Sequence, residues 1–588
     1  MKTTLDRFRP IVMRAIDSLY GEILTTNIEI QQTRKEFRGH VTVVLFPLGK
    51  IIKKPLKQIG KEIGEYVQKN LVIVHSFHLL RGFLNFECNE EYYYELLESI
   101  SKENFFMLKT SEEDALMIEY SSPNTNKPLH LGHIRNHLLG NSISEIFKAF
   151  GHNVIKIQII NDRGIHICKS MLAWKKFSYG ETPESSSLKG DHLVGKYYVA
   201  FEKAYKKEVE DLCAKGYEKE DAEKQAPIMQ EVRKLLQLWE KVDAKTWSLW
   251  NKMNTWVYEG FEQTYRRLGI DFDETQYESK TYLLGKSIIE EGLKKGVFFK
   301  KEDGSVWIDL TNEGLDEKLL LRSDGTSVYI TQDLGTAVER FERFSIKSLI
   351  YIVGEEQEYH FKVLFLILKR LGYAWADRLF HLSYGMVKLP SGKMKSREGI
   401  VIDADNLIDE MHKIAKYMTE SIGNIKKEQL FETIGLGALK YHLLKIDTKK
   451  SILFDTKSSI DFNGYTGTYI QYTYARISSL YRRSFTKMDC GNSLMRYSIV
   501  GRYEKDLLKI MEQYPEALRL AKKRLIPSII ANYAYNLSKT FNDFYQNVCI
   551  IKTKTKYDFV FRILLSKACG KILKNSMKLL GIDMPERM

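Results

Sequence analysis

The sequence lacks paired cysteines, long apolar runs and an apolar leader. Its six cysteines are scattered, and none stand at CxxC spacing, which argues against a structural zinc site and fits free thiols in a reducing compartment. No apolar run approaches the roughly 20 residues that a membrane-spanning helix needs, and residues 1–8 carry no apolar core of a signal peptide. We therefore expect a cytoplasmic protein that neither spans a membrane nor holds a metal ion of its own.

Charged residues are abundant, and positive charge is in excess. The 588 residues are 44% hydrophobic and 28% charged, with a formal net charge of +14. This composition is that of a globular protein large enough for several domains. The positive charge suits a polyanionic partner such as a nucleic acid. Lysine-rich sequences are also common in AT-biased genomes, so the charge alone does not decide the partner.

Residues 1–110 predict a small α+β module. Helical periodicity near residues 11–20 and 58–70 alternates with strand-like segments near 40–46 and 82–86. The lysines between residues 50 and 61 form a candidate RNA-facing patch, although a solvated face explains any one of them equally well. No catalytic group is evident in this module.

Residues 111–455 alternate between strand and helix patterns. The expected strands lie at 115–120, 154–160, 348–354 and 379–387, and the expected helices among them start near 131 and 361. This order predicts a Rossmann-type, doubly wound parallel sheet with its site at the carboxyl ends of the strands. The highly charged residues 172–270 are mostly helical in period and predict an insertion beside the sheet.

Residues 456–588 predict an all-α bundle. Long helical patterns with aromatic residues on their apolar faces cover 465–484, 504–525, 527–548 and 557–580. The first of these helices also carries Gln471, Tyr472 and Arg476. Aromatic and basic side chains of this kind suit stacking on splayed RNA bases. We therefore expect these three residues to contact RNA.

The most informative segment is His130–His133, of sequence HLGH. It follows an expected strand and a polar loop with two prolines, and it opens an expected helix, so both histidines lie on one face of the first helical turn. Free backbone donors and the positive end of the helix dipole suit a triphosphate at this place. Gly132 lacks a Cβ and would let a flat base approach the backbone.

A second segment supplies positive charge more than two hundred residues later. After the strand expected at 379–387, a Pro-Ser-Gly turn leads into Lys393, Lys395 and Arg397, three cations within five residues. Such a basic loop would bind most strongly as negative charge develops on a transferring phosphoryl group. The pair of segments therefore predicts chemistry on a nucleoside triphosphate.

Together the two segments resemble the HIGH and KMSKS signature motifs of class I aminoacyl-tRNA synthetases. Further segments resemble the arginyl-tRNA synthetases in particular, and the resemblance covers essentially the whole chain. They are Ser121–Asn124 with Lys127, Asn161–His166, Tyr469–Arg476 and Leu579–Glu586. The resemblance implies an N-terminal module that contacts tRNA, then a Rossmann-type catalytic domain, then a helical anticodon-binding domain.

The resemblance also implies which residues bind the substrates. Glu278, Tyr329 and Asp333 match the residues that read the amino acid, in keeping with the preference of a guanidinium for carboxylates in fork geometry. Asn124 and Gln357 match further arginine contacts. ATP is expected against residues of both motifs, namely His130, Gly132, His133, Met386, Val387 and Lys393.

The basic loop departs from the family pattern at one position. The fourth residue of the KMSKS pattern is usually lysine, and this chain has Ser396 there. In the family, a lysine just ahead of the histidine motif is thought to substitute, and Lys127 stands at that place. The cation that acts on the phosphates therefore remains open among Lys127, Lys393 and Lys395.

The activity implied by the resemblance is that of an arginine–tRNA ligase. L-arginine attacks ATP, which carries Mg²⁺ on its phosphates, to give arginyl-adenylate and pyrophosphate. Arginine then passes to the 3′-terminal adenosine of tRNA-Arg, and the first step generally needs bound tRNA. His130 and His133 would stabilise the phosphoryl oxygens. The enzyme is expected to act as a monomer.

Other adenylate-forming enzymes fit the sequence less well. The 260 residues from His133 to Lys393 leave little room for the large editing domain of the leucine, isoleucine and valine enzymes. A cysteine-charging enzyme would need clustered zinc ligands. A small-molecule ligase would not need an anticodon bundle. A catalytically silent tRNA-binding paralogue would have no need of both motifs and the acidic pair.

Overall fold

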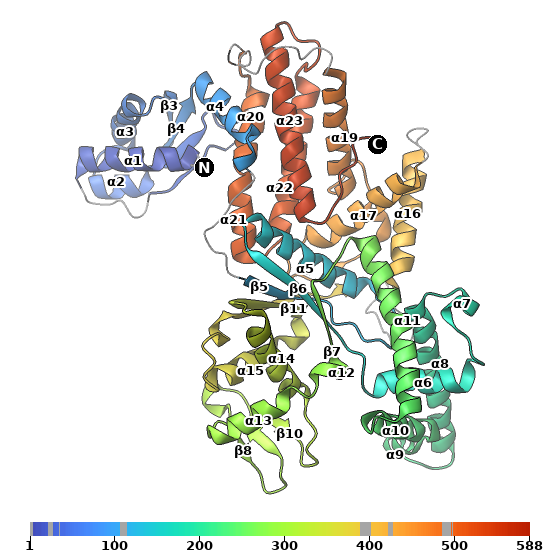
Figure 1. Cartoon of the computed structure of the whole chain (residues 1–588). Helices are drawn as coiled ribbons and strands as arrows, with labels where there is room; N and C mark the ends of the chain where they lie inside the picture. Colours follow the sequence, from blue (N-terminus) through green and yellow to red (C-terminus); the bar gives the residue numbers. More distant parts are fainter. Residues whose placement is uncertain are drawn as a thin grey trace.

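The computed structural model describes residues 4–21, 28–34, 36–105, 115–388, 402–420, 427–484, 496 and 498–588. Figure 1 shows a central parallel sheet, with a helical bundle on one side and two further lobes on the other. The N-terminal module lies beside the bundle. In the part of the chain that is described, no helix is both long and apolar enough to cross a membrane.

The N-terminal module is the expected α+β unit. Its antiparallel sheet has the order β1-β2-β4-β3, with strands Ile30–Gln32, Val41–Val44, Phe83–Cys88 and Val74–Leu80. Its helices are α1 (Thr4–Tyr20), α2 (Phe46–Ile52), α3 (Leu56–Asn70) and α4 (Glu90–Ser101). Helix α3 lies close on β3, because a Cβ at Gly60 would come within 2.5 Å of Leu79 and one at Gly64 within 2.5 Å of Phe77. The sequence did not reveal β1, β3 or α4.

The central sheet is doubly wound, as expected. All five strands are parallel, in the order β12-β11-β5-β6-β7. They are β5 (Ala115–Glu119), β6 (Asn153–Ile160), β7 (Glu274–Tyr277), β11 (Ser348–Gly354) and β12 (Leu379–Tyr384). The connections reverse direction between β5 and β11, and such a switch point forms a ligand-binding crevice at the carboxyl ends of the strands.

Two lobes interrupt the sheet. Six helices between β6 and β7 form the expected helical insertion: α6 (Ile165–Phe177), α7 (Pro183–Ser186), α8 (Gly190–Ala214), α9 (Lys219–Gln225), α10 (Pro227–Glu240) and α11 (Ala244–Leu268). Between β7 and β11 lie α12 (Glu278–Thr281), α13 (Gly285–Lys294) and α14 (Tyr329–Phe344), with a small antiparallel sheet that the sequence did not reveal. Its strands are β8 (Phe299–Lys300), β9 (Val306–Ile308) and β10 (Lys318–Leu321).

The C-terminal bundle contains the expected long helices with one correction. These are α19 (Gly467–Ser484), α20 (Arg502–Glu512), α21 (Tyr514–Arg524), α22 (Ser528–Asn547) and α23 (Lys556–Leu579). The single helix predicted over 504–525 is wrong, because two helices meet at Gln513 and Pro515 stands in the first turn of α21. Proline lacks an amide donor and disrupts a helix interior, but it is tolerated at a helix start.

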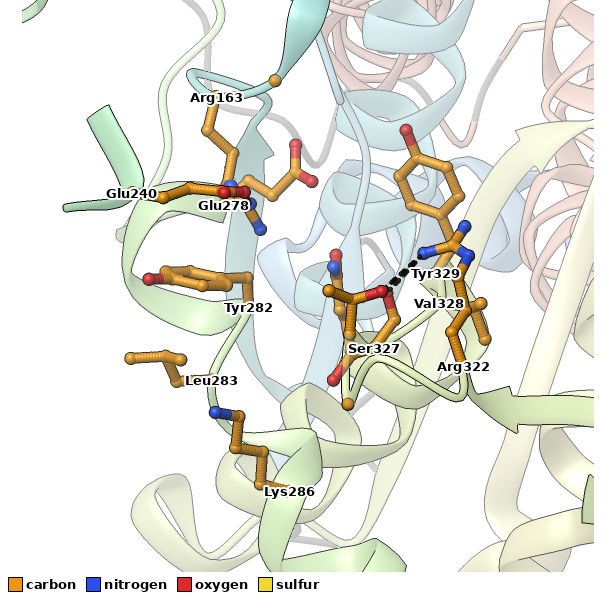
Figure 2. Close-up of a pocket in the computed structure, with 14 residues that line it drawn as sticks. Arg163, Glu240, Glu278, Tyr282, Leu283, Lys286, Arg322, Ser327, Val328 and Tyr329 are labelled. Carbon is orange, nitrogen blue, oxygen red and sulfur yellow. Dashed lines mark hydrogen bonds and ion pairs between the residues drawn. The ribbon is translucent and has the colours of Figure 1, made fainter. Parts of the chain in front are cut away.

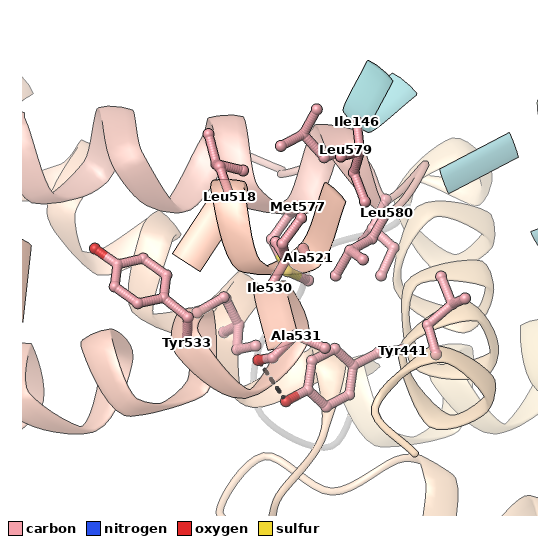
Figure 3. Close-up of a cluster of buried hydrophobic side chains, with 14 of the residues drawn as sticks. Ile146, Tyr441, Leu518, Ala521, Ile530, Ala531, Tyr533, Met577, Leu579 and Leu580 are labelled. Carbon is pink, nitrogen blue, oxygen red and sulfur yellow. Dashed lines mark hydrogen bonds between the residues drawn. The ribbon is translucent and has the colours of Figure 1, made fainter. Parts of the chain in front are cut away.

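Helix α5 (Leu131–Ala149) joins the sheet to the bundle. Asn136 donates to the carbonyl of Ile352 at 2.7 Å and accepts from the amide of Ser121 at 2.6 Å, which ties α5 to both sides of the switch point. Ile146, near the other end of α5, lies among Leu518 and Leu579 of the bundle (Figure 3). The histidine motif, the switch point of the sheet and the bundle are therefore joined by one helix.

A buried ion pair lies at the centre of the sheet. Arg340 of α14 is 1% exposed and contacts Glu119 of β5, and its Nε donates to Gln276 Oε1 at 2.9 Å.

We predict that Arg340→Met lowers the free energy of unfolding by about 3–5 kcal/mol, because Glu119 loses its partner in the interior. Replacing both residues by apolar ones should recover most of that loss. Urea unfolding midpoints test this; a wild-type midpoint in the single variant contradicts it.

Candidate active site

The two motif histidines form the first turn of α5. His130 is the N-cap residue, and its Nδ1 accepts from the amide of Gly132 at 3.1 Å. His133 Nδ1 accepts from the amide of His130 at 3.1 Å, and the two ring centroids are 3.8 Å apart. Because each Nδ1 accepts a hydrogen bond, each neutral ring carries its proton on Nε2. Both imidazoles are thereby set as hydrogen-bond donors.

Burial keeps these histidines neutral. Desolvation, and then the charge of Lys127, lower the pKa of His130 to about 4, and desolvation with the neighbouring rings lowers the pKa of His133 well below its usual value. The fully buried His137, one turn on, has its pKa lowered to about 3 by burial. The histidines therefore donate hydrogen bonds without adding charge, and a positive charge must come from lysine or arginine.

Gly132 is required by its own helix turn. A Cβ at this position would lie 3.0 Å from His130 Cε1 and 3.1 Å from His130 Nδ1. A side chain here would press on the imidazole that caps α5. The sequence suggested a different reason for glycine here, namely that the base of a nucleotide lies against the backbone. That contact stays a prediction.

Arg135 of α5 holds the strand that leads to the basic loop. Its fully buried guanidinium donates to the carbonyl of Gly385, to that of Thr448 at 3.1 Å and to that of Lys450 at 2.8 Å. The strand expected to run from 379 to 387 accordingly stops at Tyr384 and resumes as β13 (Val387–Lys388), which pairs with β14 (Ile452–Leu453). Two segments that are far apart in sequence converge on this guanidinium.

The two residues predicted to meet ATP on this strand have different surroundings. Met386 is exposed, and its carbonyl accepts from the amide of Ile452 at 2.9 Å. The side chain of Val387 is buried, so that only its backbone is placed to face a ligand. Lys393 and Lys395 lie outside the described residues.

The chain that follows the basic loop pairs with the histidine turn. The amide of Leu131 donates to the carbonyl of Ile402 at 3.1 Å, and the amide of Ala404 donates to the carbonyl of Leu129 at 3.0 Å. His130 and Asp403 thus face each other in an antiparallel bridge. The described chain on both sides of the basic loop is therefore attached to α5, through Arg135 ahead of the loop and through this bridge after it.

A cavity of about 360 Å³ opens beside the carboxyl ends of β6 and β7. Figure 2 shows Arg163, Glu240 and Glu278 on one wall, with Arg322 and Tyr329 on the opposite one. Glu278 begins α12 directly after β7, and the largely exposed Tyr329 begins α14. The lining thus combines two carboxylates and an aromatic ring, which suit a guanidinium, with three cations, Arg163, Lys286 and Arg322.

Burial controls the charge of Glu278. Desolvation raises the pKa of this carboxyl to about 7; Arg163 lowers it, and Asp162 and Asp333 raise it. A cation that binds beside Glu278 would therefore stabilise its charged form and lower its pKa. The guanidinium of Arg163 lies 3.9 Å from the ring centroid of Tyr282, and its Nη2 is 3.7 Å from Glu240 Oε1.

Asp162, for which no role was predicted, positions Glu278. It is 1% exposed, accepts from the amide and hydroxyl of Ser279 at 2.8 and 2.7 Å, and accepts from the hydroxyl of Tyr258 at 2.9 Å. These bonds fix the first turn of α12. The only sequence signal was its place in the family segment Asn161–His166.

The remaining residues expected to bind arginine are more dispersed. Asp333, one turn after Tyr329, pairs with His360 Nε2 at 2.6 Å, a partner that the sequence did not indicate. Gln357 is exposed, next to the start of α15 (Glu358–Arg370). Asn124 is exposed and its backbone bridges to Asn161. None of these three is among the described residues that line the cavity.

Of the three residues expected to contact RNA, Gln471 does not have an exposed side chain. It is fully buried, and its amide donates to the carbonyls of Thr433 and Asp583 at 3.1 and 2.9 Å. This corrects the sequence prediction: Gln471 secures the C-terminal segment inside the bundle. Tyr472 is exposed, and the guanidinium of Arg476 lies 5.0 Å from its ring and 4.7 Å from that of Tyr545.

Comparison with known proteins agrees with this geometry. Residues 95–456 match the family model for the catalytic domain of class I (R) tRNA synthetases, and residues 470–588 match the DALR anticodon-binding domain. The arginine–tRNA ligase of Flavobacterium psychrophilum is 52% identical, covering 98% of this chain and 99% of its own length. The chain belongs to the class I arginyl-tRNA synthetase family.

Other relatives extend the similarity. The arginine–tRNA ligase of Bacteroides thetaiotaomicron is 50% identical, covering 99% of each chain. The structure of the Thermus thermophilus arginyl-tRNA synthetase covers 100% of each chain with a TM-score of 0.79 at 21% identity. That of Plasmodium falciparum also covers 100% of each chain, with a TM-score of 0.75 at 20% identity. The arginyl-tRNA synthetase fold thus extends over all three parts of the chain.

The raised pKa of Glu278 predicts how arginine use depends on pH. Below about 7 this carboxyl is protonated in the free enzyme and cannot pair with a guanidinium. We expect kcat/KM for arginine to fall by up to about tenfold for each pH unit below that pKa, because kcat/KM reports the free enzyme. The kcat/KM for ATP at saturating arginine should change less. A kcat/KM for arginine that stays constant from pH 8 to pH 6 contradicts this role.

Proposed function

We propose that this chain is an arginine–tRNA ligase that uses the site around α5 and the cavity around Glu278. The observation that carries the proposal is the pairing of a neutral histidine turn with a cavity that holds the buried carboxyl of Glu278, both at the carboxyl ends of the strands of a doubly wound sheet. The first part suits phosphate oxygens and the second suits a guanidinium. Family membership over the full chain supports the same substrates.

In the first step, L-arginine lies with its guanidinium toward Glu278 and Asp333. Its carboxylate attacks the α-phosphate of ATP, and pyrophosphate leaves. His130 and His133 donate from Nε2 to phosphoryl oxygens, and Lys127 adds positive charge close to His130. Mg²⁺ carried on the ATP neutralises part of the phosphate charge. Positioning and electrostatics supply the rate, and no side chain becomes a covalent nucleophile.

In the second step, the 2′-hydroxyl of the terminal adenosine of tRNA-Arg attacks the arginyl-adenylate and releases AMP. We assign anticodon contact to the bundle surface around Tyr472 and Arg476. Arg476 is held between two tyrosine rings and contacts Asn542, so its planar group is fixed beside exposed aromatics. Such a surface suits stacking on unpaired bases.

Several finer points belong to this proposal. The assignments of Asn124, Gln357, Met386 and Val387 rest on the family resemblance together with their places near the sheet end. We also propose a monomer and a cytoplasmic location. The five cysteines in the described parts of the chain are free, which agrees with a reducing compartment.

ATP–pyrophosphate exchange with arginine, with and without a tRNA-Arg transcript, tests the function. Arginine-dependent exchange that needs the tRNA, together with charging of the transcript, is the expected result. A folded protein that binds tRNA without exchange or charging would be a silent paralogue and would contradict the proposal.

His133→Ala separates catalysis from RNA binding. Removing one preorganised donor should slow adenylate formation by about 10²–10³-fold, while the affinity for tRNA should stay within about twofold of wild type. Single-turnover adenylate formation and filter binding of tRNA measure the two effects. A variant that loses mainly tRNA affinity would contradict the assigned role.

A further inference from the structure

A cluster of charged side chains joins the helical insertion to the histidine turn. On the insertion side, Lys189 is the N-cap residue of α8 and His192 lies in its first turn. On the other side, Asp403 and Asp405 stand at the start of α16 (Ala404–Glu420). His192 Nε2 lies 3.2 Å from an oxygen of each of these aspartates. These polar contacts connect the insertion to the chain that pairs with the histidine turn.

Lys189 completes the cluster. Its ammonium contacts Asp405, lies 3.2 Å from Asp191 Oδ2 and donates to Thr264 Oγ1 at 2.6 Å. Asp191, His192 and Asp405 could otherwise hold a cation, since their ligand atoms lie within 4.8 Å of one another. The lysine already supplies a positive charge between two of them. We therefore treat the cluster as a structural ion-pair network.

Charge strengthens the contact of His192. Although burial lowers its pKa, the hydrogen bond to Asp405 and the charges of Asp191 and Asp403 raise it above the usual value, while Lys189 opposes them. The same hydrogen bonds outweigh burial at Asp405 and lower the pKa of that carboxyl. His192 therefore makes a hydrogen bond to Asp405 and an ion-pair contact with Asp403, both at 3.2 Å, and protonation of its ring would strengthen both contacts.

Asp403 transmits this contact to the active site. Its Oδ1 accepts from the amides of Asp405 and Asn406, both at 3.0 Å, and so caps α16, while its Oδ2 faces His192. Its backbone bridges to His130. His130, His192 and Asp403 also line one cavity of about 220 Å³ together with Lys127. A displacement of Asp403 would therefore also displace His130 and Lys127, the residues proposed to contact the phosphates.

We propose that His192 is a positioning residue that holds Asp403, and through it the His130 turn, in the geometry needed for adenylate formation, and that Lys189 supports it by holding the neighbouring Asp405. This inference rests on the proposed function. The inference assigns the helical insertion, a lobe outside the parallel sheet, a specific role in adenylate formation. Neither residue has to touch the substrate.

The test compares wild type with variants at His192, His412 and Asp403 in tRNA-dependent ATP–pyrophosphate exchange, with Asp403→Asn made both alone and together with His192→Leu. His192→Leu keeps bulk but removes the donor, and His192→Gln keeps a donor. The matched control, His412→Leu, removes a histidine on α16 that bridges Glu428 and Glu432 at 2.9 and 3.0 Å with similar exposure, away from the histidine turn. Each variant is assayed for kcat, for the KM of each substrate and for its unfolding midpoint.

We expect His192→Leu to lower kcat by about tenfold or more, since small misplacements of positioned groups can cost up to about a hundredfold. The KM for arginine should stay within about twofold of wild type, because the cavity around Glu278 lies apart from the cluster around His192. His192→Gln should recover much of the kcat, and His412→Leu should keep the wild-type value. Adding Asp403→Asn to His192→Leu should produce no further loss, because both changes break one contact.

A wild-type kcat in His192→Leu, an equal loss in His412→Leu, or no recovery in His192→Gln would each overturn the inference. Additive losses in the double variant would overturn the route through Asp403. If wild-type protein itself shows no arginine-dependent exchange, the proposed function fails first, and the inference fails with it. The wild-type and control measurements thus distinguish the two failures.

Discussion

The structure depends on what helix α5 holds at its two ends. At its N-terminus, the imidazoles of His130 and His133 take up backbone amides and leave their Nε2 protons facing outward. Just beyond, the buried guanidinium of Arg135 gathers three carbonyls from two distant segments. Near its other end, Ile146 packs into the bundle. Since interiors are close-packed, these ends cannot shift independently.

The electrostatics follow from this packing. Burial keeps the histidines neutral, so they can act as hydrogen-bond donors without charge, and Lys127 places a positive charge near His130. In the cavity around Glu278 burial also disfavours the charged form and raises the pKa of this carboxyl to about 7. In the proposed mechanism, phosphate oxygens would accept from the histidines and a guanidinium would pair with Glu278.

Much of the architecture could be predicted from the sequence, because periodicity and motif spacing are local properties. The strands β5, β6 and β11 and the long bundle helices lie close to where their apolar patterns placed them. The break in the strand expected over 379–387 was not visible, because it depends on the carbonyl of Gly385, which accepts from Arg135, a residue of another element. The only sequence signal for the break at Gln513 was Pro515. Proline is tolerated in the first turn of a helix but not in its interior, so its effect depends on where the helix begins.

The site residues that sequence reasoning missed act across long sequence separations. Asp162 fixes Ser279 from 117 residues away, and His360 pairs with Asp333 across 27. Gln471 showed the reverse error, because its polar side chain faces two buried carbonyls instead of solvent. A single sequence reveals which groups are present, whereas their partners depend on the tertiary fold.

The central claim is that α5, through Arg135, couples the histidine turn to the strand that leads into the basic loop. Arg135→Lys tests it most directly, because lysine keeps the charge but cannot hold three carbonyls in the geometry of a guanidinium. We predict a fall of about tenfold or more in kcat for ATP–pyrophosphate exchange, with an unchanged KM for arginine. A folded Arg135→Lys protein with the wild-type kcat would contradict the account.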